Sequence, residues 1–175
     1  MSLTLAREQS ATAKLVDSCK LRETQHMIGL LQRVREARVE IEGQVVGSIR
    51  QGLLVLVGVE RGDGLSQTQR LAERLQNYRV FADKQGRMNL SVNQIGGAVL
   101  LVPQFTLAAD TTQGNRPGFS RAADPAIGEN LFAALVRTMQ QSGLQVATGQ
   151  FGADMQVYSC NDGPVTFSLR VAPQA

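Results

Sequence analysis

The fold is decided by residues 28–60, which read IGLLQRVREARVEIEGQVVGSIRQGLLVLVGVE. Apolar and polar residues alternate through this stretch, as they do in strands that bury one face. Turn signals at Glu42-Gly43 and Gln51-Gly52 divide it. The stretch therefore predicts two strands in a hairpin, followed by a more buried third strand at residues 53–59.

A first helix is expected to follow this strand. It would begin with Ser66 as its cap and run to about residue 77. Leu71, Leu75 and Tyr78 fall on one stripe at helical spacing, which is typical of a helix that packs on a sheet.

The second half of the chain is expected to add strands and a second helix. Residues 98–102 are almost entirely apolar and predict a buried strand, and a long polar loop follows at residues 108–123. Asp124 caps the second helix, Pro125 takes its first position and Gly143 ends it. The buried stripe of this helix consists of Leu131, Leu135 and Met139.

Residues 144–171 are expected to form short strands broken at Gly149, Gly152 and residues 161–163. Strands, then two strand–helix units, then more strands predict an α/β fold with a mixed sheet and both helices on one side. No internal repeat or low-complexity stretch divides residues 27–175, so we expect a single domain there.

Residues 1–26 differ from everything that follows. They mix isolated apolar residues with polar ones and show no sustained period. We expect an N-terminal extension, either a disordered tail or a non-native stretch upstream of a true start at Met27. A short amphipathic helix is the other interpretation.

The composition indicates an ordinary globular protein. Hydrophobic residues make up 43% of the chain and charged residues 19%. The net charge of +3 is too small to indicate binding to a long nucleic-acid duplex. Cys19 and Cys160 lie far apart and no secretory signal is present, so we expect a reduced, cytoplasmic protein. No apolar run reaches the roughly 18 residues that a membrane helix needs, so no membrane partner is expected.

Several catalytic mechanisms are excluded by the residues present. His26 is the only histidine and precedes the predicted fold, so a Ser-His-Asp or Cys-His mechanism lacks its proton shuttle. The sequence has no metal-ligand spacing, no P-loop and no GxGxxG motif opening a helix. It therefore predicts no metal and no cofactor, and a site built from backbone amides, hydroxyls and side-chain amides.

Two segments are candidates for such a site. Residues 103–107, Pro-Gln-Phe-Thr-Leu, follow the buried strand, where sheet proteins place ligand groups. The simpler interpretation of these residues is the end of a strand with a bulge, because Pro103 has no N–H group to donate to the hydrogen bonds of a sheet. Residues 161–166, Asn-Asp-Gly-Pro-Val-Thr, form an ordinary turn signal, although a Gly-Pro bond is also able to be cis. Spacing alone assigns a function to neither segment.

Taken together, the two segments resemble those of the D-aminoacyl-tRNA deacylases. The resemblance covers residues 27–171 nearly end to end, in order and in spacing, and leaves residues 1–26 outside. Its landmarks are Gln32-Arg33-Val34, Leu54–Val59, Tyr78–Phe81, Met88–Leu90, Gln104–Asp110, Arg116-Pro117, Ala153–Val157 and Asn161–Thr166.

The resemblance implies a fold, an activity and a partner. The fold is a three-layer β/β/α sandwich, barrel-like, with two helices on one side, and two subunits form a homodimer. The activity is hydrolysis of the ester that joins a D-amino acid, or glycine mischarged on tRNA-Ala, to the terminal adenosine of tRNA. L-aminoacyl-tRNA is rejected, so the enzyme proofreads chirality in translation. The partner is the aminoacylated 3′ end of tRNA, and DNA is not expected as a partner.

The resemblance also implies roles for particular residues. Gln104, Phe105 and Thr106 are the catalytic residues that line the pocket, and the Phe105 N–H is suited to bind an oxyanion. Gly163-Pro164 is a cis dipeptide inserted into the other subunit's site, where its carbonyls capture the substrate's amino group and exclude an L side chain. Arg33 positions this loop. The other supporting residues are Met155, Asn161, Thr166 and Phe119.

The chain departs from the family pattern at two positions. Pro103 and Gly118 each stand where the family usually has Ser. A serine hydroxyl at position 103 is therefore not essential to the chemistry. A sister group of deacylases with different selectivity shares the Pro but has Ala where Phe105 stands.

The mechanism and the functional class leave alternatives open. An aminoacyl ester is already activated, so backbone donors and a terminal ribose 2′-OH assisting water suffice without an ionisable side chain. The rival is Thr106 as a covalent nucleophile, for which no general base is available. The other classes are a non-catalytic module that binds RNA ends or small ligands, which an ester-hydrolysis assay would separate from an enzyme, and a structural oligomer subunit.

Overall fold

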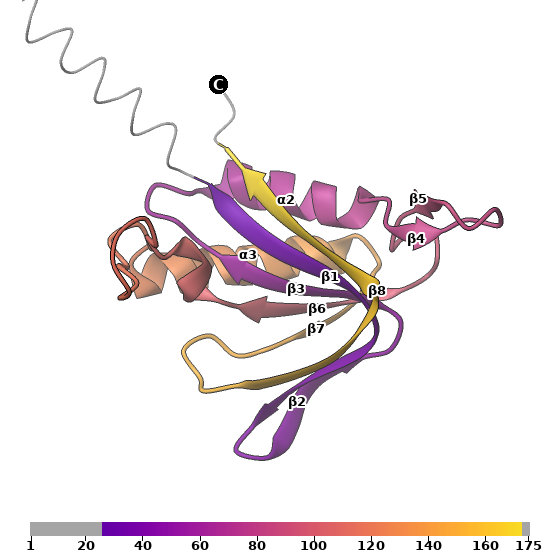
Figure 1. The fold of residues 1–175 in the computed structure, drawn as a ribbon, viewed down its shortest axis with the longest axis horizontal. Helices are drawn as coiled ribbons and strands as arrows, with labels where there is room; N and C mark the ends of the chain where they lie inside the picture. Colours follow the sequence, from indigo (N-terminus) through magenta and orange to yellow (C-terminus); the bar gives the residue numbers. More distant parts are fainter. Residues whose placement is uncertain (1–25, 173–175) are drawn as a thin grey trace, which may run out of the picture.

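The computed structural model describes residues 26–172, which form one large mixed sheet, a small hairpin and two α-helices (Figure 1). The predicted N-terminal extension lies outside the described residues, except for His26. No helix within residues 26–172 is long and apolar enough to span a membrane. The elements are β1 (Met27–Ile41), β2 (Gln44–Ile49), β3 (Gly52–Gly58), α2 (Leu65–Asn77), β4 (Phe81–Ala82), β5 (Met88–Leu90), β6 (Ala98–Pro103), the 3-10 helix η1 (Phe105–Ala108), α3 (Pro125–Gln141), β7 (Gln145–Thr148) and β8 (Gln156–Val171).

Strand β1 organises the sheet because it pairs with three other strands. Its first half pairs antiparallel with β3, from Ile28 opposite Gly58 to Val34 opposite Gly52. Its second half pairs antiparallel with β2, and β8 follows β1 along both halves. The strands β6 and β7 run parallel to β3 and extend the sheet, which gives the order β2-β1-β3-β6-β7.

The sheet folds over on itself at the middle of β1. The register of β1 against β8 shifts on both sides of Val34, between Gln32 and Glu36. Such bulges bend strands, and β1 and β8 bend together here (Figure 1). Strand β2 then approaches β7 so closely that a Cβ atom at Gly47 would lie 2.6 Å from the Thr148 carbonyl oxygen. The sheet is therefore nearly closed and barrel-like, as predicted.

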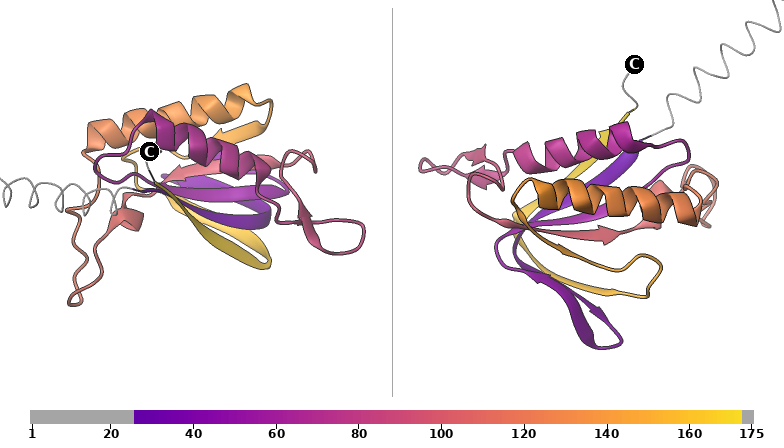
Figure 2. Two further views of the ribbon diagram at one scale, coloured as in Figure 1. Left: turned by 90° about the horizontal axis from the view of Figure 1, so that it is seen from above. Right: turned by 180° about the vertical axis from the view of Figure 1, so that it is seen from behind.

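Two hydrophobic clusters separate the three layers. Helices α2 and α3 lie side by side on one face of the sheet (Figure 2), where Leu71 and Leu135 pack in one cluster with Leu31 of β1. Leu100 and Val39 belong to a second cluster, enclosed by the two halves of the folded sheet. All five side chains are fully buried, and burial of such a side chain stabilises a fold by roughly 1.5–3 kcal/mol. The β/β/α layering is thus confirmed.

The predicted start of the first helix needs a correction. Helix α2 begins at Leu65 with Gly64 as its N-cap, so the predicted Ser66 cap is wrong. The Gly64 N–H donates to the side-chain oxygen of Gln67 at 3.1 Å, which satisfies one of the free donors at the helix end. The apolar stripe itself is confirmed, since Leu71 and Leu75 are buried.

The predicted second helix is confirmed and the predicted tail only in part. Helix α3 has Asp124 as its N-cap and Pro125 in its first turn, and its predicted stripe is buried. Strand β8, however, is one long strand and not two. It pairs with β1 at both Asn161 and Thr166, so the Asn-Asp-Gly signal makes a bulge inside the ladder instead of a break.

Two buried carboxyl groups lie at the connection between β3 and α2. Glu60 and Asp63 are only 2% and 8% exposed. The Glu60 N–H donates to Asp63 Oδ2 at 2.7 Å, and Arg121 and Arg170 lie 3.8 and 4.0 Å from Glu60 Oε1. Burial raises the pKa of Asp63 to about 7; the Glu60 N–H opposes this rise and the Glu60 carboxylate adds to it.

Asp63 is expected to make the protein less stable as the pH rises. The pKa of an unfolded Asp is about 3.9, so between pH 4 and pH 7 only the folded state keeps the proton, and the free energy of unfolding falls over this window. Between pH 5 and pH 8, the free energy of unfolding of the wild-type protein should fall by about 2 kcal/mol more than that of the Asp63→Asn variant, as measured by urea unfolding. An identical pH dependence in the two proteins would contradict the shifted pKa.

Candidate active site

A cavity of about 480 Å³ opens at the C-terminal end of β6. Strand β6 ends at Pro103, and η1 begins two residues later. The segment before α3 and the loop between β7 and β8 complete the cavity walls. The side chains that matter below are those of Gln104, Phe105, Phe151, Asp154, Met155 and Val157, all of which line the cavity.

The polar groups at this end of β6 are held by short hydrogen bonds. The Gln104 N–H donates to the Val57 carbonyl at 2.7 Å, which fixes the segment on β3. The Gln104 Nε2 donates to Thr106 Oγ1 at 2.6 Å. Phe105 and Thr106 begin η1, so their N–H groups have no acceptor inside that helix. N–H groups of this kind are suited to stabilise a developing oxyanion.

Apolar side chains form much of the remaining wall. Phe105 is 58% exposed, and the centre of its ring lies 5.1 Å from that of Phe119. A Cβ atom at Gly149 would lie 2.7 Å from Met155 Sδ, so a larger residue there would displace the end of the methionine side chain from its place in the wall. An apolar wall with a few polar donors is the usual character of a small-ligand site.

The cavity offers little acid–base chemistry. Asp154 is the one ionisable residue in its lining. The Thr106 hydroxyl is hydrogen-bonded to the Gln104 amide nitrogen, which donates to it and has no capacity to accept its proton. Within residues 26–172, no three His, Cys, Asp or Glu side chains gather into a potential metal site. Apart from Asp154, the polar groups that line this cavity are therefore backbone groups and the Gln104 side-chain amide.

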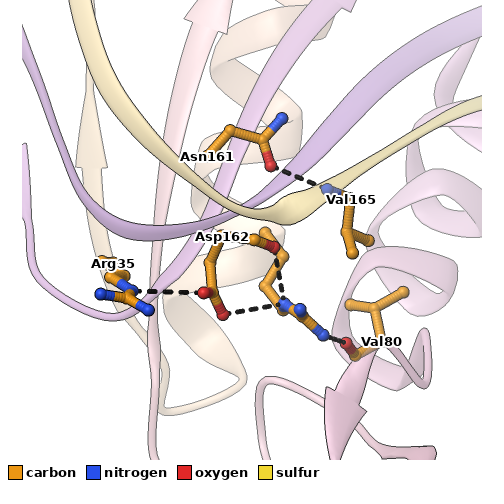
Figure 3. A network of polar contacts seen from close by, with 6 residues as sticks. Arg35, Val80, Asn161, Asp162 and Val165 are labelled. Atoms are coloured by element: carbon orange, nitrogen blue, oxygen red, sulfur yellow. Dashed lines mark hydrogen bonds and ion pairs between the residues drawn. The ribbon is translucent and has the colours of Figure 1, made fainter.

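The second predicted segment lies where β8 bends. The Gly163–Pro164 peptide bond is cis, and Gly163 has a φ angle of 133°. A Cβ atom at Gly163 would lie 2.7 Å from Val165 Cγ2, so both the backbone angle and the space favour glycine. Asn161 closes the segment (Figure 3): its Oδ1 accepts the Val165 N–H at 2.9 Å, and its Nδ2 donates to Thr166 Oγ1 at 2.8 Å.

Arg33 ties this segment to another part of the fold. Its Nε donates to the Asp162 carbonyl at 3.1 Å and lies 3.2 Å from the Asp162 carboxylate, while its Nη1 donates to the Val80 carbonyl at 2.6 Å. The Arg33 side chain is 15% exposed, against 77% for Arg35, which pairs with the same carboxylate (Figure 3). Arg33 therefore has the more shielded and more fully bonded guanidinium.

The two predicted segments lie at opposite ends of the subunit. Pro103 pairs with Val57 of β3, and Val57 pairs with Gly29 of β1, so Pro103 and Gly29 lie at the same height in the sheet. Gly163-Pro164 lies opposite Arg33, four residues further along β1 and three strands from β6. This separation amounts to roughly 13 Å along the strands and roughly 14 Å across them. In Figure 1 the C-terminal end of β6 and the shared bend of β1 and β8 lie on opposite sides of the sheet.

The predicted site residues accordingly fall into two groups. The first group comprises Gln104, Phe105 and Met155, which line the cavity, with Thr106 and Phe119 in contact with them. The second group comprises Arg33, Asn161, Gly163, Pro164 and Thr166 at the bend. A single chain does not bring the groups together, and the roles implied for them stay predictions.

Sequence reasoning missed several residues that belong to these groups. Asp162 is the partner of Arg33, and the sequence showed a turn signal around it. Phe151 and Val157 line the cavity. Phe151 packs against Gly128 of α3, a long-range contact that leaves no local pattern. Val157 and Asp162 both lie within landmarks of the family resemblance, so both had a signal that could have identified them.

A larger cavity of about 940 Å³ lies at the other end of the sheet, between β1, β2, β8 and the loop before β6. Its walls include Glu36, Arg38 and Arg50. It contains none of the residues predicted for the site, so size alone does not make it the active site. We assign the candidate active site to the smaller cavity, at the end of β6.

Comparison with known proteins identifies the family. The family model described as D-Tyr-tRNA(Tyr) deacylase matches residues 30–170. A D-aminoacyl-tRNA deacylase of Methylococcus capsulatus is 58% identical over 147 residues, which cover 84% of this chain and 96% of the relative. One of Pseudomonas putida is 59% identical over 145 residues, which cover 83% of this chain and 100% of the relative. The chain belongs to the D-aminoacyl-tRNA deacylase family. It is therefore a hydrolase, as predicted.

Solved structures share the fold of this deacylase. A structure named c-Myc DNA Unwinding Element Binding Protein has a TM-score of 0.79 and 32% identity, and covers 85% of this chain and 100% of its own. A structure described as a probable eukaryotic D-amino acid tRNA deacylase has a TM-score of 0.73 and covers 83% of this chain. Its identity is 14%, so it supports the fold alone.

Replacing Arg33 with Lys is expected to destabilise this deacylase by about 1–3 kcal/mol. The single ammonium group of Lys is unable to reproduce the hydrogen bonds that the guanidinium group donates to Val80 and Asp162 at the same time. The matched control is Arg35→Lys, which keeps an exposed ion pair and should change stability by less than about 0.5 kcal/mol. Urea unfolding of both variants measures the difference. Equal losses would show that Arg33 does not anchor the Gly163 loop.

Proposed function

We propose that the chain hydrolyses the ester between a D-amino acid and the terminal adenosine of tRNA, as a proofreading enzyme of translation in the cytoplasm. Glycine mischarged on tRNA-Ala is a second substrate because it lacks a side chain, and L-aminoacyl-tRNA is left intact. The proposal is carried by the cavity at Gln104-Phe105, in a chain that matches the deacylase model over residues 30–170. The partner is tRNA, and DNA is not a substrate because the mechanism uses a ribose hydroxyl.

The proposed chemistry needs no charged side chain. As water attacks the ester carbon, the carbonyl oxygen gains negative charge, and the N–H groups of Phe105 and Thr106 are suited to stabilise it. The ribose 2′-OH next to the ester orients the water and relays a proton to the departing 3′-oxygen. The products are the free amino acid and tRNA. Because the ester is activated, the required barrier reduction is at the small end of the enzymatic range.

We further propose that a second copy of the chain completes each active site. Gly163-Pro164 lies far from the cavity of its own chain, as the strand registers require. Strand β8 also exposes apolar side chains, with Val157, Tyr158 and Phe167 exposed by 38%, 41% and 37%. Because Val157 and Tyr158 point to opposite faces of β8, a two-fold interface would cover only part of this apolar area, and it would set the loop of each chain at the cavity of the other. The loop carbonyls would then hold the substrate's amino group and leave no room for an L side chain.

Thr106 is expected to be dispensable as a nucleophile. Thr106→Ala should keep at least about a tenth of the wild-type rate on D-tyrosyl-tRNA, because the hydrogen-bond partner of the Thr106 hydroxyl is the Gln104 amide nitrogen, which has no capacity to take its proton. A tRNA ending in 2′-deoxyadenosine should react about 100-fold more slowly or worse. Single-turnover assays measure both rates. An inactive but folded Thr106→Ala enzyme, beside a fully reactive deoxy substrate, would return the chemistry to the Thr106 hydroxyl.

The shared site predicts complementation between two inactive variants. Phe105→Pro removes an oxyanion donor and should lower kcat/KM about 100- to 1,000-fold. Gly163→Ala forces a Cβ atom against Val165 and should displace the loop from the other chain's cavity. After subunit exchange, about half of the dimers are mixed and hold one intact site, so about a quarter of the wild-type activity should return.

The complementation test needs two controls. Size-exclusion chromatography and circular dichroism establish that each variant folds and dimerises, and differently tagged chains establish that mixed dimers form. Confirmed mixed dimers without recovered activity would mean that the cavity and the Gly163 loop serve the same chain.

A further inference from the structure

The small hairpin formed by β4 and β5 is separate from the main sheet and projects from the body near the bend of β8 (Figure 1). Its residues, 79–90, include three exposed cations: Arg79, Lys84 and Arg87. Asp83 is the one acidic residue among them, so the hairpin carries a net charge of +2 (three cations minus one acid). The whole chain has a net charge of only +3. The hairpin is thus one of its most cationic segments.

The hairpin's positive charge is not neutralised by the rest of the subunit. Within residues 26–172, none of the three cations forms an ion pair. Asp83 stabilises the turn of the hairpin instead: its carboxylate accepts hydrogen bonds from the N–H groups of Gln85 and Arg87 at 2.9 and 3.0 Å. The Arg87 N–H, more than any other contact, lowers the pKa of Asp83. Arg79 donates to the Asn89 carbonyl at 2.7 Å and so closes the base of the hairpin. Lys84 and Arg87 therefore present their charges to solvent.

The base of the hairpin is fastened to the Gly163 loop. Val80 and Phe81 are only 1% and 3% exposed, so they anchor the hairpin in the core. Arg33 donates to the Val80 carbonyl and to the Asp162 carbonyl at the same time. An arrangement that positions the Gly163 loop at a second chain's cavity consequently brings the base of the hairpin close to that cavity as well.

We propose that Lys84 and Arg87 contact phosphates of the tRNA acceptor end whose terminal ester lies in the other chain's cavity. The inference rests on the shared-site dimer proposed above. From Val80 to the tip at Gly86 the hairpin extends by up to roughly 20 Å, which suits phosphates upstream of the terminal adenosine. Lys and Arg contacts to phosphates position a nucleic acid without reading its sequence.

The test compares Lys84→Gln/Arg87→Gln with Arg137→Gln, which removes an exposed cation from the helical layer. The hairpin variant should raise KM for D-tyrosyl-tRNA, and Kd for uncharged tRNA, about tenfold with kcat unchanged. The slope of log Kd against log salt should fall by about 1.4, for two lost contacts to single-stranded RNA. Hydrolysis of 3′-D-tyrosyl-adenosine, which has no upstream phosphate, should stay at the wild-type rate in both variants.

Mixed dimers test whether the hairpin acts on the other chain's cavity. In a dimer of Phe105→Pro and Gly163→Ala chains, the Phe105→Pro chain supplies the intact loop and the other chain supplies the intact cavity. Hairpin substitutions on the loop-supplying chain should raise KM about tenfold, and those on the cavity-supplying chain should not. The reverse pattern, or unchanged Kd and KM with wild-type deacylation, would overturn the inference and leave the proposed function standing. Loss of hydrolysis of the adenosine ester as well would show that the substitutions damage the fold, and would also overturn it.

Discussion

The bend that β1 and β8 make together at Val34 is the constraint on which the rest of the structure depends. Val34 is fully buried at the bend, and the two sheet halves that meet there enclose the second hydrophobic cluster. The register shifts leave residues 162–165 out of the ladder, and backbone groups outside a ladder need other partners. Arg33 and Asn161 supply them. The bend that nearly closes the barrel is thus also what holds the Gly163 loop in its conformation.

The proposed mechanism separates rate from selectivity. In this proposal, hydrolysis would rest on the N–H groups at Phe105 and Thr106 and on the substrate's ribose, whereas selection would rest on backbone carbonyls of the Gly163 loop. A wall of backbone would reject an L substituent through a steric clash, a repulsive element of the kind that specific sites use beside favourable contacts. It also ignores the identity of a D side chain, because it meets only the groups on the α-carbon. Such a site would need a rigid loop more than a tuned pKa, and the hydrogen bonds of Arg33 to the Asp162 and Val80 carbonyls are suited to restrain the loop.

Local patterns predicted the elements well because burial and capping are local signals. The stripe of α3 and its Asp124-Pro125 start follow directly from residue spacing. The Ser66 cap failed because the helix begins one residue before Ser66: Gly64 is the N-cap, and its N–H is bound by the Gln67 side chain. The break at residues 161–163 failed because tertiary pairing with β1 continues across a turn signal. The residues of the candidate site were found through family resemblance, but their division between two ends of the subunit emerged only from the strand registers.

The central claim is that this chain distinguishes the D form of an aminoacyl ester from the L form. The most direct measurement incubates the enzyme with D-tyrosyl-tRNA and L-tyrosyl-tRNA in parallel and follows release of tyrosine, with enzyme-free tubes as the background. The account predicts rapid hydrolysis of the D ester and an L ester that decays at the background rate. Comparable enzymatic cleavage of L-tyrosyl-tRNA would contradict it.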